Sequence, residues 1–223
     1  MGSPPRRIRA LAVTSALLLA GGAAAQVPFD SVPLADVLEV MLLDRDLVAI
    51  DANSGGQRRE RLLLGENVLW MDSRGAVGAV LTDQRILAVG VGSGSWQESR
   101  YLRTESPPRD ALLGDRVALV TTASRAIGFS SSTGSLVETQ LGVHEKLVTR
   151  RVGENVAVVV TDRRALGLSP LVGGFFSVDL LLKEKIESID ARANLVTLTT
   201  ERRLLIFRSP TGSWEVRRRE LNP

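Results

Sequence analysis

The chain of 223 residues contains no cysteine and one histidine, His144. The absence of cysteine excludes disulfides, thiolate metal sites, a cysteine nucleophile and the lipid-modified cysteine of a bacterial lipoprotein. A Ser-His-Asp triad would have to use His144, which lies between Val143 and Glu145 at a predicted strand connection, so we interpret it as a surface residue. The sequence shows no nucleophile elbow, paired-histidine metal motif or phosphate-binding loop. We therefore expect no metal and no cofactor.

Without its first 25 residues, the chain also lacks an excess of charge of one sign. The first 25 residues hold three arginines and no acidic residue, so their removal leaves 25 basic and 25 acidic residues. Because nucleic-acid binding usually needs a broad positive field, this balance gives no support for a nucleic-acid partner.

Residues 1–25 have the pattern of a cleaved export signal. A basic head at Arg6, Arg7 and Arg9 precedes an apolar run and an A-x-A cleavage site before Gln26. The run is shorter than the ~20 residues of a bilayer span, which disfavours a membrane anchor. We expect residues 1–25 to be a signal peptide, residues 26–223 to form one domain with no transmembrane segment, and the protein to be periplasmic or secreted from a bacterium.

An internal repeat is the strongest pattern in the chain. The segments that begin at Val80, Val120, Val159 and Thr197 share an apolar stretch, a polar turn and a second apolar stretch. Each segment contains an arginine, and these four arginines follow one another at 39 or 40 residues. A step of 40 residues back from the first of them, Arg85, reaches Arg45. A threonine stands three residues before each of these arginines except Arg45. A recurring glutamate opens the stretch that leads into the next copy: Glu66, Glu105, Glu145 and Glu184.

Each copy contains four short stretches with the alternation of strands. Four antiparallel strands in ~40 residues are typical of a propeller blade. We therefore predict an all-β, five-bladed β-propeller. We expect residues 26–40 to pair with residues 213–221, so that the N- and C-terminal strands close the ring and remove an open edge.

The segment from Asp46 to Gly55 resembles the repeat of PQQ-like (quinoprotein-like) propellers. The resemblance covers about ten residues of one copy. It implies a propeller-type repeat and carries no cofactor residue onto this chain.

The recurring arginines are the most regular polar feature, and they are Arg45, Arg85, Arg125, Arg164 and Arg203. Convergent guanidinium groups suit anions, so these residues are candidate ligands of a phosphate or an acidic polymer. The alternative is that each pairs with an acidic residue of its own turn and stabilises the hairpin.

Aromatic residues are only 4% of the chain. Trp96, Phe175 and Trp214 fall at one repeat position, where Leu136 replaces them in another copy, and this favours packing between blades. Trp70 lies outside that register and is a further candidate ligand-binding residue, with burial in the core as the alternative.

We predict a non-catalytic binding or scaffold protein that presents one loop face to a glycan, a peptide or an envelope protein. That face is expected to contain five segments: Ser73–Ala76, Gly90–Gly94, Gly114–Arg116, Pro170–Gly174 and Arg192–Asn194. The alternative is a glycoside hydrolase or lyase with carboxylates near the propeller axis. The strands expected to be innermost carry acids only at their exits, which disfavours that alternative.

Overall fold

The structure is a computed structural model that describes residues 36–219, and the predicted signal peptide therefore lies outside the described residues. Every regular element of residues 36–219 is a strand. The strands are β1 (Leu38–Leu43), β2 (Asp46–Asp51), β3 (Gln57–Arg61), β4 (Val68–Arg74), β5 (Val77–Thr82), β6 (Arg85–Gly90), β7 (Gln97–Arg100), β8 (Leu112–Leu113), β9 (Val117–Thr121), β10 (Arg125–Ser130), β11 (Ser135–Gln140), β12 (Leu147–Val152), β13 (Ala157–Thr161), β14 (Arg164–Ser169), β15 (Gly174–Asp179), β16 (Ile186–Arg192), β17 (Leu195–Thr200), β18 (Arg203–Arg208) and β19 (Ser213–Arg218). No helix within this part of the chain is long and apolar enough to cross a membrane.

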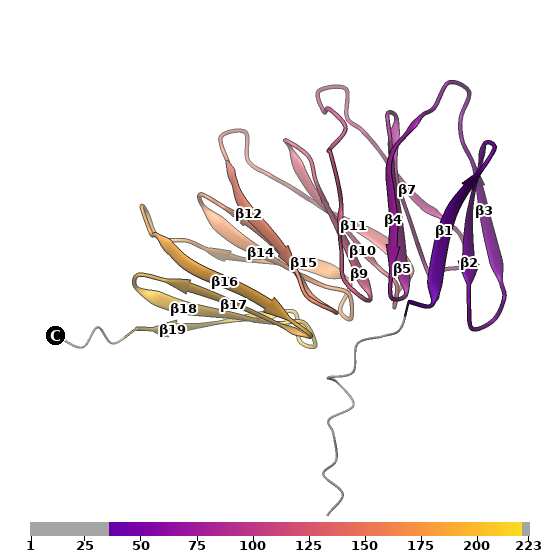
Figure 1. Ribbon diagram of the computed structural model, residues 1–223. Coiled ribbons are helices and arrows are strands. Elements are labelled where there is room, and N and C mark those ends of the chain that lie inside the picture. Colours follow the sequence, from indigo (N-terminus) through magenta and orange to yellow (C-terminus); the bar gives the residue numbers. More distant parts are fainter. Residues whose placement is uncertain (1–35, 220–223) are drawn as a thin grey trace, which may run out of the picture.

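The strands form five antiparallel sheets in sequence order, which are the five blades of a propeller-type fold. Strands β4–β7, β8–β11, β12–β15 and β16–β19 each make a four-stranded meander, and β1–β3 make a three-stranded sheet. Figure 1 shows the sheets fanned out one after another, with the first and the last at opposite ends of the fan. The predicted all-β class is confirmed, and the five successive sheets fit the predicted five blades.

The core lies between the faces of successive sheets. Strands β5, β9 and β13 are buried on both faces, as their near-continuous apolar sequences predict. Val156, Val158 and Val160 of one sheet, for example, pack against Val196 and Leu198 of the next.

Two glycines in the middle of strands allow close stacking of the sheets. A Cβ atom at Gly167 would lie 2.5 Å from the ring of Phe207, and one at Gly128 would lie 2.4 Å from Leu168. Each glycine therefore provides the space that the large side chain of the following sheet fills.

The strand pairing that was predicted to close the ring differs from the structure. Residues 38–40 belong to β1, which pairs with β2, and β19 pairs with β18 alone among the described residues. The prediction is wrong for residues 38–40 because the apolar side chains of Leu38 and Val40 are buried against the second sheet. Residues 26–35 lie outside the described residues.

The register of the first copy also differs from the prediction. Leu43 pairs with Asp46 across a two-residue turn, and Asp44 has a positive φ of 55°. In the second copy Leu81 pairs with Ile86, and Arg85 is the first residue of β6. The residue that corresponds to Arg85 is therefore Asp46, and Arg45 lies in the turn outside the arginine series.

Candidate functional site

Four of the five predicted arginines take part in one repeated side-chain cluster. In each cluster a glutamate from the connection between sheets accepts hydrogen bonds from an arginine and a threonine, and we call this arrangement the clasp. The clasps are Glu66–Thr82–Arg85, Glu105–Thr122–Arg125, Glu145–Thr161–Arg164 and Glu184–Thr200–Arg203. All four lie at the same end of the sheets, which we call the clasp end.

The clasp around Glu145 shows the geometry. Arg164 Nε donates to Glu145 Oε1 over 2.8 Å, and Arg164 Nη2 donates to Oε2 over 3.0 Å. The hydroxyl of Thr161 donates to Oε1 over 2.7 Å, and the backbone N–H of Gly142 donates to Oε2 over 2.7 Å. Arg164 Nη2 also donates to the carbonyl of Gln140, so both partners of this bidentate pair are satisfied within the fold.

The clasps leave little of these arginines for a ligand. The Arg85 and Arg125 side chains are 3% and 5% exposed, those of Arg203 and Arg164 are 15% and 26% exposed, and the clasp glutamates are nearly fully buried. Arg85 and Arg125 bind further acids, Glu60 and Glu98 in one case and Glu138 in the other. The partners of the arginines are thus glutamates of the connections and of neighbouring strands, and not the turn acids that the sequence suggested.

Arg45 makes different contacts. It is exposed, and its Nη2 donates to the carbonyls of Leu62 and Leu63 over 3.0 and 2.6 Å. The structure therefore brings four of the five arginines into equivalent positions and leaves Arg45 as a turn residue that binds main-chain oxygens.

The clasps hold their carboxyl groups in the ionised form. Burial by itself favours the neutral acids at Glu105 and Glu145, but hydrogen bonds from arginine, hydroxyl and backbone donors outweigh it and lower the pKa of each to about 2. The bond from Arg203 lowers the pKa of Glu184 to about 2, and the pKa of Glu66 is also lowered.

We expect acid to unfold the protein by protonating the clasps. Because the folded pKa values lie below the ~4.3 of an unfolded glutamate, their stabilisation is complete above about pH 5 and is lost as the pH falls toward about 2. Urea melts at a series of pH values, followed by tryptophan fluorescence, measure this loss. A midpoint that stays constant between about pH 5 and pH 3 would contradict the prediction.

The aromatic residues serve the core. Trp96 is buried between the first and second sheets, and its indole N–H donates to the carbonyl of Arg58. Trp214 packs against Phe207 and donates to the carbonyl of Phe176. These contacts confirm the predicted packing between blades. Trp70 is partly buried and packs against the core cluster between the second and third sheets, which is the alternative that the sequence left open.

The described residues contain no cluster of three or more histidine, cysteine or acidic side chains that could hold a metal ion. His144 is exposed at a connection between sheets.

The strands that were predicted to be innermost, which include β5, β9 and β13, differ in place from the prediction. Each is the second strand of its sheet, with a strand on either side, and none is an edge strand.

The other end of the sheets, which we call the glycine end, contains the five loop segments predicted to share a face. Backbone hydrogen bonds join neighbouring segments, such as Val91 N–H to Ala76 O and Ala76 N–H to Asp115 O, both within 3.0 Å. The segments therefore lie at one end of the sheets, and the binding role of that face stays a prediction.

Backbone hydrogen bonds also tie the hairpin turns of successive sheets into one row at the glycine end. Ala76 N–H donates to Asp115 O, Arg116 N–H to Glu154 O, and Asn155 N–H to Ala193 O, over 2.7 to 3.0 Å. Two glycines make this approach possible, because a Cβ atom at Gly75 would lie 2.5 Å from Asp115 O and one at Gly114 would lie 2.0 Å from Gly153 O. The row is therefore a rigid support for the side chains that it presents.

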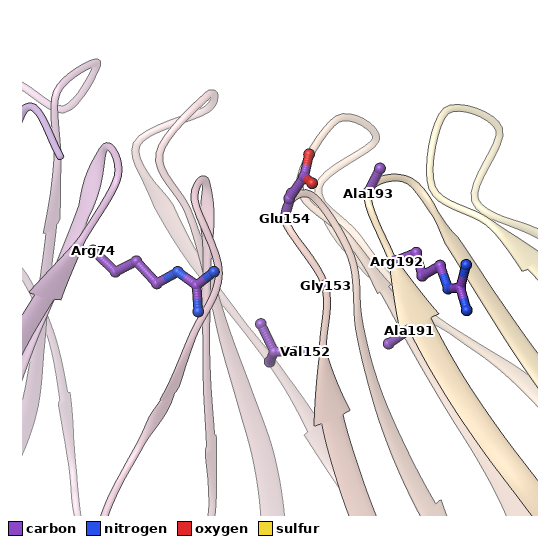
Figure 2. A pocket seen from close by; sticks show the side chains of 7 residues that line it. All are labelled: Arg74, Val152, Gly153, Glu154, Ala191, Arg192 and Ala193. Carbon is purple, nitrogen blue, oxygen red and sulfur yellow. The ribbon is translucent and has the colours of Figure 1, made fainter. Parts of the chain in front are cut away.

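An open hollow of about 460 Å³ lies along this row. Its lining residues are Arg74, Val152, Gly153, Glu154, Ala191, Arg192 and Ala193. Figure 2 shows Arg74 extending toward Val152, Glu154 at the top of its turn, and Arg192 pointing away from Arg74. Small and aliphatic residues thus make the floor, while charged side chains stand at the rim.

The rim charges are accessible. The side chains of Arg74 and Arg192 are 59% and 83% exposed, and their partners are Asp115 at 3.3 Å and Asp190 at 2.6 Å. The pair of Arg192 with Asp190 is exposed on both sides and contributes little to stability, so a ligand carboxylate can replace Asp190 at small cost. Asp115 is buried, and Arg74 offers a ligand the exposed part of its guanidinium group. Sequence reasoning included Arg74 and Arg192 in its loop segments but missed Glu154, which no repeated pattern marks.

Comparisons with known proteins give fold likenesses only. No protein-family model matches the chain, and no curated protein matches it. Solved structures that resemble it include that of Kap60 bound to yeast RCC1 (Prp20), at 11% identity over 79% of this chain and 55% of that chain with a TM-score of 0.41. Apo AztD from Citrobacter koseri matches at 13% identity over 80% and 58% with a TM-score of 0.38. The N-terminal domain of Nup159 matches at 10% identity over 85% and 63% with a TM-score of 0.35. The chain spans less than two thirds of the length of each of these proteins.

Proposed function

We propose that the protein is an exported, non-catalytic binding protein that receives an acidic peptide segment of a protein partner at the glycine end. The observation that carries the proposal is the hollow beside the row of tied turns, with an apolar floor and exposed charges at its rim. A backbone that is already fixed loses little conformational entropy on binding.

The chemistry of the hollow favours a peptide over a glycan or a small molecule. Pockets for such ligands are usually lined by aromatic side chains with a few polar groups, and no aromatic residue lines this hollow. Arg74 offers a planar, permanently charged donor for a partner carboxylate. Val152 and Ala191 offer an apolar surface for a neighbouring aliphatic side chain of the same segment.

The hollow does not supply the groups that glycoside hydrolysis requires. A glycosidase needs two carboxyl groups about 5–10 Å apart on either side of the scissile bond. Glu154 is the one carboxylate among the lining residues of this hollow. The alternative of a hydrolase or lyase therefore receives no support from this site.

A displayed peptide library tests the proposal on the form that begins at Gln26. We expect the protein to enrich peptides with acidic residues next to an aliphatic one, and Arg74→Glu to weaken their binding about tenfold or more. Arg59→Glu is the control, because Arg59 is another exposed arginine, on β3 and outside the hollow. Binding that Arg74→Glu and Arg59→Glu weaken equally, or turnover of a polysaccharide, would refute the proposal.

A further inference from the structure

The connections between sheets form a second surface, at the clasp end. Each connection makes a β-turn in which the clasp glutamate donates its N–H to the carbonyl three residues earlier, as in Glu66 to Leu63 and Glu184 to Leu181. The first central residues of these turns are Leu64, Arg103, Val143 and Leu182.

Three of these four turn residues are aliphatic and almost completely exposed. Leu64, Val143 and Leu182 are 89%, 95% and 88% exposed, and Leu181 beside Leu182 is 45% exposed. The fold gains no burial from these side chains, and any polar residue could occupy the same turn position. A role in contacts outside the chain accounts for them better than a role in folding.

The clasps hold these turns rigidly. The carboxylate of Glu145 binds the N–H of Gly142 at the start of its turn, and the carboxylate of Glu184 binds the N–H of Leu181 in the same way. Val143 and Leu182 therefore stand exposed on fixed turns of the β11–β12 and β15–β16 connections. Figure 1 shows the connections that lead into β12 and β16 on the upper side of the fan.

The lysines of the chain gather around the same two turns. All three lysines of the sequence, Lys146, Lys183 and Lys185, lie in or next to the turns of Val143 and Leu182, and all three are exposed. The only carboxylates within residues 142–146 and 181–185 are Glu145 and Glu184, which the clasps neutralise.

Cations balance the acidic residues of the adjoining hairpin turns. Asp162 accepts the backbone N–H of Lys146 and keeps its charge, but the exposed Arg163 follows it, and Glu201 pairs with Arg202 at 3.5 Å. The three lysines therefore leave the net charge at the two protruding turns positive.

We propose that the turns of Val143 and Leu182 dock the protein on the surface of an anionic lipid bilayer. Aliphatic side chains that enter the acyl boundary, with lysines at the level of the headgroups, are the combination that holds proteins at such surfaces. A bilayer accommodates separate protruding side chains, whereas a protein partner would need a pocket for each of them. This surface lies opposite the glycine end and is independent of the peptide site.

Vesicle sedimentation tests this proposal with the form that begins at Gln26. We expect binding to vesicles of phosphatidylglycerol and phosphatidylcholine, and little binding to phosphatidylcholine alone or at high salt. Val143→Ser/Leu182→Ser should lower the partition coefficient about tenfold or more. Because both side chains are exposed, the thermal midpoint of the variant should equal that of the unchanged protein.

Two further variants separate the contribution of the aliphatic side chains from that of the lysines. Leu64→Ser removes an equally exposed leucine from a turn without lysine, and we expect less than about a twofold change in partition. Lys146→Gln/Lys183→Gln/Lys185→Gln should remove the salt dependence. Absence of binding to anionic vesicles, equal binding to neutral ones, or no effect of the Val143 and Leu182 changes would overturn the proposal.

Discussion

Replacing Arg164 with methionine should destabilise the protein by about 3 kcal/mol, because it leaves a buried carboxylate without its cation. The Glu145 side chain is 4% exposed, and Arg164 supplies two of its hydrogen bonds. Thr161 and the N–H of Gly142 remain as partners, but neither carries a charge. Urea denaturation followed by tryptophan fluorescence measures the loss.

The double variant Glu145→Leu/Arg164→Met distinguishes a buried charge from a simple loss of contacts. Replacing both members of a buried pair with apolar residues removes the desolvation cost as well as the attraction, so the double variant should be more stable than Arg164→Met alone. Arg163→Met is the matched control, since Arg163 is exposed beside Arg164, and its effect should stay within about 0.5 kcal/mol. A double variant as unstable as the single one would contradict this account.

The first sheet supports this reasoning, because it forms without a clasp. Its positions that correspond to Thr82 and Arg85 are Leu43 and Asp46. Leu43 is 52% exposed and Asp46 is half-buried, so neither leaves an unpaired charge in the core. The clasp is thus a stabilising device that a blade can lack.

The recurring glutamates, threonines and arginines can each be found in the sequence at the same spacing of 39 or 40 residues. Their common period predicts that they occupy equivalent places in each copy, but it does not say that they meet. The meeting depends on the meander, which brings the connection before a sheet to the hairpin turn between the second and third strands of that sheet. The equal spacing of the glutamates and the arginines was the signal that could have predicted their pairing. The sequence interpretation paired the arginines with the turn acids instead.

The register of the first copy could not be read from the pattern. Apolar residues occupy both faces of β1, with Leu38 and Val40 on one face and Met41 and Leu43 on the other, so alternation does not distinguish the two registers. Arg45 then supplied a match at a spacing of 40, although the two-residue turn with Asp44 at positive φ places Asp46 in the arginine position.

The exposed turn residues illustrate a further limit. Leu64, Val143 and Leu182 stand in apolar sequence surroundings, where hydrophobicity alone predicts burial. Their exposure follows from the turns, which are fixed by the clasp glutamates two residues after each of them. A surface of this kind becomes visible only when the fold gives each side chain a direction.

Replacing Gly114 with alanine should destabilise the protein by about 3 kcal/mol. This cost is at the upper end of the range for overpacking, because the neighbours of the added methyl group are backbone atoms. A Cβ atom there would lie 2.0 Å from the carbonyl oxygen of Gly153 and 2.9 Å from that of Glu154. Neither oxygen can move away by a change of rotamer. Relief requires the turns of the third and fourth sheets to separate, which would break the bond from Arg116 N–H to Glu154 O.

The matched control for this prediction is Gly94→Ala, since a Cβ atom at Gly94 meets nothing within 4 Å and its φ is not in the left-handed region. That change should be neutral or stabilise the protein by up to about 1 kcal/mol, because it restricts the unfolded chain. Since Glu154 lines the hollow, the separation of the turns in Gly114→Ala should also weaken peptide binding there, while Gly94→Ala preserves it. Equal denaturation midpoints for the two variants would show that the tied row of turns does not hold the sheets together, and the rigid support proposed for the peptide site would then be absent.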